Sequence, residues 1–232
     1  MHLSQISIDK EKFPTQESYP FNLEIFQQTE SLEITTPVTF FVGENGTGKS
    51  TLLEAIARRS GIHIWGEIDR ERVVKNPYEK AMYYAVNVAW RDGQVPGSFF
   101  ASQTFRNYAK LIDEWAVSDP ELLNYYGGSS LITQSHGQSL MSYFRNRYKI
   151  KGLYFLDEPE TALSPKTQVE LLELLQTVGA EGHAQFVIAT HSPILLACPG
   201  ARIYDFDSAP IKSINYEETE HYRVYKDFLS KH

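Results

Sequence analysis

Cysteine and long apolar segments are nearly missing from this chain. Its 232 residues include one cysteine, Cys198, so an internal disulfide is excluded. A single thiol is typical of proteins from reducing compartments, and we expect a cytoplasmic location. No run approaches the roughly 20 apolar residues of a membrane-spanning helix, so we predict no direct membrane insertion. Residues 1–13 also lack the apolar core of a signal peptide.

Positive charge, repeats and long heptad patterns are also scarce. The chain has 22 lysines and arginines against 29 acidic residues, a formal net charge of −7. This balance argues against a uniformly basic nucleic-acid surface, although it leaves room for a local basic patch. No apolar heptads are long enough for a coiled-coil arm. The remaining composition is that of a globular protein, and the length predicts a single domain over residues 1–232.

The most specific pattern in the chain is a phosphate-binding loop of the form G-x-x-x-x-G-K-[ST]. The pattern and its flank are Gly43, Glu44, Asn45, Gly46, Thr47, Gly48, Lys49, Ser50 and Thr51. An apolar run at 38–42 predicts a buried strand before it, and 50–57 predicts a helix after it. Glycines let successive N–H groups point inward toward phosphate. We expect Lys49 to reach the β- and γ-phosphates and the Ser50 hydroxyl to hold Mg²⁺.

A second constellation follows the apolar run at 152–156, which predicts a central parallel strand. Asp157 ends this strand and is the candidate second Mg²⁺ contact. Glu158 comes next and is the candidate general base that polarises the attacking water. An isolated Asp-Glu pair is as often a solvated turn, but the phosphate loop upstream favours the catalytic interpretation.

Three further candidates are weaker on their own. His191 follows the predicted strand at 184–189, on the sheet edge where a γ-phosphate would lie, although lone histidines are usually structural. Gln103 lies between the two halves of the chain and has no signal by itself. Tyr19, Phe13 or Phe26 is available to stack on adenine, although such aromatics more often belong to the core.

The other segments alternate between strand and helix patterns. Strands are predicted at 2–8, 21–26, 31–35, 61–66, 201–206 and 211–214, helices at 105–115, 137–148, 165–178 and 217–229, and 81–90 fits either. Such alternation predicts an α/β fold with ligands at the carboxyl ends of the strands.

Taken together, these motifs resemble those of ABC-type ATPases. Four motifs occur in the same order as in that family: the phosphate loop, the strand 153–159, the D-loop at 162–164 and His191. The family's L-S-G-G-Q signature corresponds in position to Ser135-His136-Gly137-Gln138. The chain is most similar to small stand-alone bacterial AAA/ABC-like ATPases related to repair and chromosome-maintenance heads.

The resemblance implies a P-loop NTPase fold of ABC-ATPase type. Its mostly parallel central sheet would be flanked by helices, with an antiparallel N-terminal β part and a small inserted helical subdomain over about 60–148. It implies ATP and Mg²⁺ as ligands and Gln103 at the metal. It also implies an ATP-sandwiched head-to-tail homodimer in which Ser135, Gly137 and Gln138 bind the partner's nucleotide.

This sequence departs from the family pattern at several positions. Gln134 replaces the signature leucine, His136 replaces its first glycine, and Ser164 stands where the D-loop usually has Asp. These changes bear on contacts across the dimer and leave the nucleotide-binding motifs intact.

Three functions fit the resemblance. A soluble switch acting on a nucleic-acid or protein partner in repair or defence is favoured by the aromatic 61–130 segment and the atypical signature. A transporter's nucleotide-binding subunit is the alternative, because 61–130 is short enough for a subdomain with a groove for a membrane partner. An ATP sensor with little turnover is disfavoured by Glu158, since a sensor needs no base.

Overall fold

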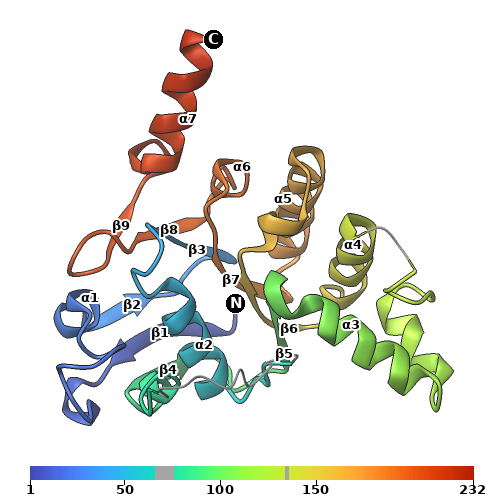
Figure 1. The fold of residues 1–232 in the computed structure, drawn as a ribbon, viewed down its shortest axis with the longest axis horizontal. Coiled ribbons are helices and arrows are strands. Elements are labelled where there is room, and N and C mark those ends of the chain that lie inside the picture. The colour runs from blue at the N-terminus through green and yellow to red at the C-terminus, as the bar shows by residue number, and fades with distance from the viewer. Residues whose placement is uncertain (66–75, 134–135) are drawn as a thin grey trace.

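Two β-sheets form the body of this computed structural model, which describes residues 1–65, 76–133 and 136–232, with His136 by its backbone alone (Figure 1). The larger sheet has the strand order β5-β6-β7-β3-β8-β9. These strands are β3 (Val38–Val42), β5 (Gly97–Ala101), β6 (Gly152–Asp157), β7 (Ala184–Ala189), β8 (Arg202–Asp205) and β9 (Lys212–Ile214). Its neighbouring strands are parallel except β8 and β9. The predicted α/β class with a mostly parallel central sheet is confirmed.

The smaller sheet is the predicted antiparallel N-terminal part. It pairs β2 (Ser31–Glu33), β1 (Leu3–Ile8) and β4 (Val86–Trp90) in that order. The ambiguous run at 81–90 therefore divides into a 3-10 turn at Ala81–Tyr84 and strand β4.

Alternating side chains of the central strands enter two apolar cores, one on each face of the large sheet. On β3, Phe41 joins the core shared with the small sheet, and Phe40 joins the core under the later helices. β3 and β7 are buried along their whole length, which explains why their sequences are continuous apolar runs.

Gln185 is the polar exception within β7, and it joins the two sheets. Its Oε1 accepts hydrogen bonds from the backbone N–H groups of His2 and Leu3, each at 2.7 Å. Its Nε2 donates to the carbonyls of Leu3 at 3.0 Å and Ile34 at 3.1 Å. A fully buried amide is stable here because its donor and acceptor groups are satisfied.

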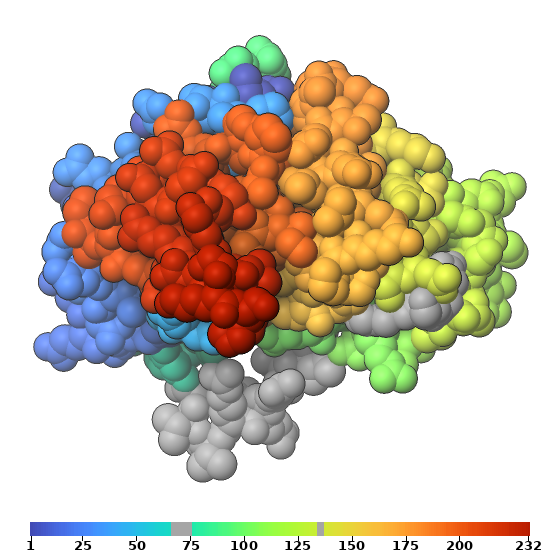
Figure 2. All heavy atoms as spheres, turned by 90° about the horizontal axis from the view of Figure 1, so that it is seen from above, coloured from blue at the N-terminus to red at the C-terminus, as the bar shows by residue number. Residues whose placement is uncertain are grey.

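Helices cover both faces and extend the molecule beyond the sheet (Figure 1). They are α1 (Glu24–Gln28), α2 (Lys49–Arg59), α3 (Ser102–Ala116), α4 (His136–Arg147), α5 (Pro165–Ala180), α6 (Pro193–Leu196) and α7 (Glu220–Lys231). α3, a 3-10 segment at Pro120–Tyr126 and α4 pack together as a helical lobe on the β5 side. Figure 2 views the face from which α7 projects, and there α7 is the red segment nearest the viewer. The extent of an inserted subdomain over 60–148 stays a prediction.

Two strand predictions were wrong. Residues 21–26 form a turn and the first part of α1, which begins at Glu24, and Phe26 is fully buried against the phosphate loop instead of pairing with a strand. This burial also removes Phe26 as an adenine platform. Residues 61–65 form no strand, although Ile62 and Ile64 are buried in the core, and Gly66 lies outside the described residues.

Strand β5 was not predicted from its sequence. Gly97 and Ser98 weaken the apolar pattern, but the strand pairs in parallel with β6 from Gly97 to Ala101. Gly97 is required there because a Cβ atom would lie 2.0 Å from the carbonyl oxygen of Leu153. Tertiary pairing, and not local propensity, makes this segment a strand.

Candidate active site

The parallel register brings the predicted site residues to one edge of the large sheet. Ala189 pairs with Phe41 on one side and Asp157 on the other, and Asp157 pairs with Ala101. The segments that follow β3, β5, β6 and β7 therefore emerge side by side. They carry the phosphate loop, Gln103, the Asp157-Glu158 pair and His191.

The phosphate loop has the backbone conformation that its glycines allow. Gly43, Gly46 and Gly48 have φ of +148°, +85° and +99°, respectively. A Cβ on Gly48 would lie 2.8 Å from Cζ of Phe26, so α1 approaches the loop closely. α2 begins at Lys49, directly after the loop, and its N-terminus faces the same edge.

Lys49 is 4% exposed, and its Nζ donates to the carbonyl oxygens of Gly43 and Glu44, each at 2.7 Å. Burial lowers the pKa of Lys49, while the nearby carboxylates of Glu158 and Asp207 act in the opposite direction. Among the described residues, the hydrogen-bond partners of Nζ are neutral carbonyls. A buried ammonium with such partners suits an anionic ligand.

Ser50 and Asp157 meet across the edge although they lie far apart in the sequence. The Ser50 hydroxyl donates to Oδ1 of Asp157 at 2.8 Å. Burial raises the pKa of Asp157 to about 7, and the Ser50 hydrogen bond opposes this rise. A hydroxyl and a carboxylate are hard oxygen ligands that fit Mg²⁺.

No cluster of three or more His, Cys, Asp or Glu residues in the described ranges is arranged to hold a metal ion. Ser50 and Asp157 are the side chains at this edge that would fit a Mg²⁺, whose other ligands would be phosphate and water oxygens. Gln103, the second residue of α3, is exposed two positions beyond the β5 residue that pairs with Asp157. Its role at the metal remains a prediction.

Glu158 has a backbone conformation that is rare for a residue with a side chain. Its φ is +46° and its ψ is 53°. The carbonyl oxygen accepts hydrogen bonds from the hydroxyls of Ser102 at 2.6 Å and Thr161 at 3.0 Å, and these contacts hold the turn. Its Oε1 lies 3.8 Å from Nε2 of His191. Such strained residues often occur at functional sites, and this one aims the carboxylate toward His191.

His191 is held by its backbone and its ring. Its N–H donates to Oε1 of Glu160 at 2.6 Å, and its Nδ1 lies 3.1 Å from Nε2 of His221. Its Nε2 is buried and has no hydrogen-bond partner among the residues that the structure describes. Burial lowers the pKa of His191, and the positive charge of Lys49 lowers it further, so the neutral ring is favoured.

Sequence reasoning missed three residues of this site, which are Glu160, Asp207 and His221. Oδ1 of Asp207 accepts from the backbone N–H of Glu44 at 2.7 Å. Glu160 belongs to the same Asp-Glu-Pro-Glu segment as Asp157, so its position was a usable signal. The sequence has no comparable signal for Asp207 and His221, because their contacts form only when β8 and α7 have taken their positions in the fold.

Tyr19 lies beside the loop, where its hydroxyl is hydrogen-bonded to Oγ1 of Thr51. Its ring is 37% exposed, and its stacking on adenine remains a prediction. Phe13 packs instead against Phe21, with ring centroids 4.7 Å apart.

The described part of the predicted signature segment begins α4. Gln134 and Ser135 fall outside the described residues, and Gly137 and Gln138 are in the first turn of α4. α4 packs on α5, on the β5 side of the sheet (Figure 1). This surface is distinct from the edge that carries Lys49.

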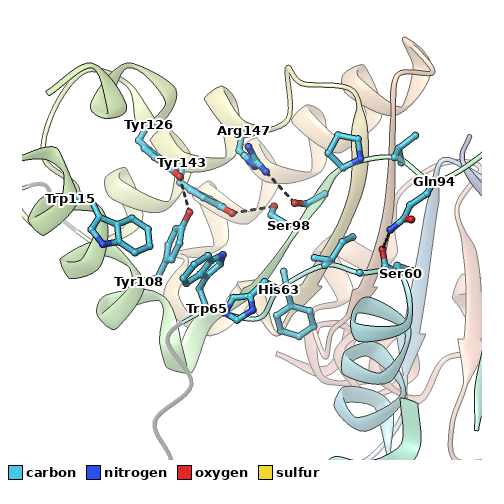
Figure 3. A pocket seen from close by; sticks show the side chains of 16 residues that line it. Ser60, His63, Trp65, Gln94, Ser98, Tyr108, Trp115, Tyr126, Tyr143 and Arg147 are labelled. Carbon is cyan, nitrogen blue, oxygen red and sulfur yellow. Dashed lines mark hydrogen bonds between the residues drawn. The ribbon is translucent and has the colours of Figure 1, made fainter. Parts of the chain in front are cut away.

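A hollow of about 550 Å³ lies between the helical lobe and the start of β5 (Figure 3). Trp65 and Trp115 meet edge to face at one side, with centroids 5.3 Å apart. On the opposite side the Tyr143 hydroxyl donates to Oγ of Ser98 at 3.2 Å, and Arg147 donates to the Gly97 carbonyl at 3.1 Å. This aromatic hollow is at the opposite end of β5 from Gln103.

Comparisons with known proteins agree with this arrangement. One AAA-domain family, whose description names the AbiEii toxin of a Type IV TA system, matches residues 137–197, and a second AAA-domain family matches residues 21–59. A metal-chelate type ABC transporter in an inward-facing conformation superposes with a TM-score of 0.55 at 16% identity, covering 97% of this chain and 88% of that chain. The SMC head domain from Thermotoga maritima superposes with a TM-score of 0.50 at 14% identity, covering 93% and 100%, respectively.

The chain has the fold of an ABC-type P-loop ATPase head. Two curated relatives are ATP-binding proteins. The petrobactin import ATP-binding protein FpuD of Bacillus anthracis is 23% identical over 175 residues, which cover 69% of this chain and 64% of FpuD. The siderophore transport system ATP-binding protein YusV of Bacillus subtilis (strain 168) is 24% identical over 186 residues, covering 73% and 67%. The chain thus spans just under two thirds of the length of FpuD.

None of the helices in the described ranges combines the length and apolarity needed to cross a membrane.

Proposed function

We propose that this ATPase head binds and hydrolyses Mg²⁺–ATP and works as a nucleotide-dependent homodimer. In this proposal it acts in the cytoplasm as a soluble switch on a nucleic-acid or protein partner, in repair or defence. The observation that carries the proposal is the convergence of Lys49, the Ser50–Asp157 pair and the Glu158–His191 pair at one sheet edge.

Each group has a task that its position suits. The loop N–H groups and Lys49 hold the β- and γ-phosphates. Ser50 and Asp157 hold Mg²⁺, which neutralises phosphate charge when bound. Glu158 orients the attacking water and accepts its proton, and His191 donates from Nε2 to a γ-phosphate oxygen.

The dimer completes the site in this proposal. Ser135, Gly137 and Gln138 of the partner bind the γ-phosphate, because a helix N-terminus favours an anion. The position of α4 on the β5 side of the sheet, where it packs on α5, supports this role. Loss of the γ-phosphate would then open the dimer.

The experiment that tests nucleotide binding is calorimetric titration of Mg²⁺–ATP into Lys49→Ala. We expect a large loss of affinity with the fold retained, because the side chain serves phosphate charge and, within the described ranges, is held by two carbonyls. Lys110→Ala, an exposed position on α3, is the control that should bind as the wild type does. Unchanged affinity in folded Lys49→Ala would refute the loop assignment.

The transporter subunit is a second candidate, because both curated relatives are named as import or transport ATP-binding proteins. The aromatic hollow would then receive a membrane partner. A stable complex with a membrane-spanning protein in detergent extracts, weakened by Trp115→Ala, would favour this alternative over the soluble switch. The third candidate, a sensor with little turnover, predicts ATP binding without steady-state phosphate release.

A further inference from the structure

His191 does not stand alone at the active-site edge, because the second residue of α7 packs against it. Nε2 of His221 lies 3.1 Å from Nδ1 of His191, and the two ring centroids are 5.2 Å apart. This contact connects a turn after β7 to the last helix of the chain. The motifs at this edge account for His191 but give no role to His221.

The number of protons on the two rings restricts which ring can donate a hydrogen bond to the other. Burial lowers the pKa of both His191 and His221, so each ring is neutral near pH 7 and has one N–H. The contact therefore needs one ring as donor and the other as acceptor. The charged groups that act on His221 are Glu44, Lys49, Asp207 and Glu220, in addition to the neutral His191.

The surroundings of His191 decide between the two arrangements. If His191 donated from Nδ1, its Nε2 would turn a lone pair toward Oε1 of Glu158, 3.8 Å away. Two acceptors would then face each other in a partly buried place, which is unfavourable. If His221 donates instead, Nε2 of His191 has the proton and faces the carboxylate as a donor.

Unsatisfied atoms give a second, independent indication. In the part of the chain that the structure describes, neither Nε2 of His191 nor Nδ1 of His221 has a hydrogen-bond partner, and both atoms are buried. Buried polar nitrogens normally have partners, so an orphan at the sheet edge indicates a place for an absent acceptor. On the proposed function, on which this step rests, that acceptor is a γ-phosphate oxygen.

We propose that His221 is a positioning residue, which donates from Nε2 to Nδ1 of His191 and so holds His191 in the tautomer with its proton on Nε2. Hydrogen bonding at one ring nitrogen generally selects the tautomer at the other. The Nε2–H of His191 is then already in place to donate to the γ-phosphate of ATP. ADP has no γ-phosphate to accept this hydrogen bond.

The same contact connects the nucleotide to α7. The hydroxyl of Tyr216, just before α7, donates to the carbonyl of Pro193 at 2.9 Å, so the base of α7 is fixed to the turn that holds His191. No residue of α7 is buried, and the helix projects from the body (Figure 1). The His191–His221 contact and the Tyr216–Pro193 hydrogen bond therefore both join the base of α7 to the segment that carries His191.

The decisive experiment measures the tautomer of His191 by ¹H–¹⁵N correlation spectroscopy of nucleotide-free protein, with the signal assigned by its loss in His191→Gln. We expect proton on Nε2 in the wild type and a mixture of tautomers in His221→Ala. His221→Gln should restore the wild-type tautomer, because its amide keeps a donor near the same place. His232→Gln, at the exposed end of α7, is the matched control.

Activity provides the second readout. We expect His221→Ala to slow ATP hydrolysis on the order of 10-fold, as for other residues that orient a functional histidine. ADP affinity should be unchanged, and His221→Gln should recover most of the rate. An unchanged His191 tautomer in His221→Ala, or equal loss in the alanine and glutamine variants, would overturn the proposal.

The two proposals fail in different ways. If Lys49→Ala binds ATP normally, the nucleotide assignment fails, but the tautomer measurement, made without nucleotide, still decides the role of His221. If nucleotide binds as proposed but the tautomer of His191 is the same with and without the His221 side chain, only the positioning role of His221 is wrong.

Discussion

In the proposed reaction, Glu158 is the residue on which the chemical step depends most directly. Glu158→Gln keeps the size of the side chain and the hydroxyl contacts to its carbonyl, but an amide is a poor base. We expect retained Mg²⁺–ATP binding and a loss of turnover on the order of 10²–10⁴. Steady-state phosphate release measures this, with Glu170→Gln on the surface as control. Near-normal turnover would mean that another group activates the water.

Asp157 should affect metal dependence more than nucleotide binding itself. Asp157→Asn removes a negative charge from the candidate Mg²⁺ site, while its amide oxygen still accepts from Ser50. We expect the curve of activity against Mg²⁺ concentration to shift to higher concentration, with little change in the affinity for metal-free ATP. An unshifted curve would place the metal elsewhere.

Cys198 provides a test of burial at a position outside the site. Burial raises the pKa of its thiol to about 11, and the side chain is 7% exposed. Below this pKa the thiol stays protonated, so the nucleophilic thiolate is scarce at pH 8. We expect slow reaction with a disulfide reagent in the native protein, a rate that rises about tenfold per pH unit up to about pH 11, and rapid reaction in denaturant. Fast native labelling at pH 8 would contradict the buried position.

At the scale of elements, the contact between α1 and the phosphate loop is the feature that the structure adds. Gly46 and Gly48 both have positive φ, so alanine is strained at either position. Only at Gly48 would the new Cβ meet a neighbour, at 2.8 Å from Phe26, whereas nothing lies within 4 Å at Gly46. The two glycines therefore form a matched pair.

We expect Gly48→Ala to lower the melting temperature and the ATP affinity more than Gly46→Ala does. The backbone strain is about 1–2 kcal/mol at each position, and the displacement of Phe26 adds to it only at Gly48. Thermal unfolding and calorimetric titration of both variants measure the difference. Equal effects would show that α1 does not support the loop.

At the scale of the whole molecule, the proposed dimerisation is a property that one subunit cannot show. Ser135→Arg should leave ATP binding to the monomer nearly unchanged but block nucleotide-dependent dimer formation. The guanidinium would fill space meant for the partner's γ-phosphate, and overpacking costs about 1–3 kcal/mol at each of two symmetric sites. The positive charge of the arginine would attract phosphate and so favour dimer formation. The prediction therefore requires a steric cost larger than this attraction.

Light scattering in the Glu158→Gln background, with and without Mg²⁺–ATP, tests this prediction. Ser118→Arg, an exposed position elsewhere on the helical lobe, is the control and should dimerise normally. A nucleotide-dependent dimer that survives Ser135→Arg would show that the signature segment is not at the interface.

The sequence alone determined the parts of this protein whose signal is local. The mostly apolar runs of β3, β6 and β7 predict buried strands, because a strand covered on both faces needs apolar side chains on both faces. The loop from Gly43 to Ser50 predicts phosphate binding, because its glycines and lysine serve the ligand with little help from the rest of the chain. From these segments, the parallel fold and its ligand edge followed.

Only the tertiary structure decided the rest, because the deciding contacts join residues that are distant in the sequence. β5 is a strand through its pairing with β6, and 21–26 is not one because Phe26 packs under Gly48. His221 meets His191 only because α7 is anchored beside α6. A contact across 30 residues leaves no periodic pattern in either segment, so the sequence predicted the phosphate loop and left the second histidine unseen.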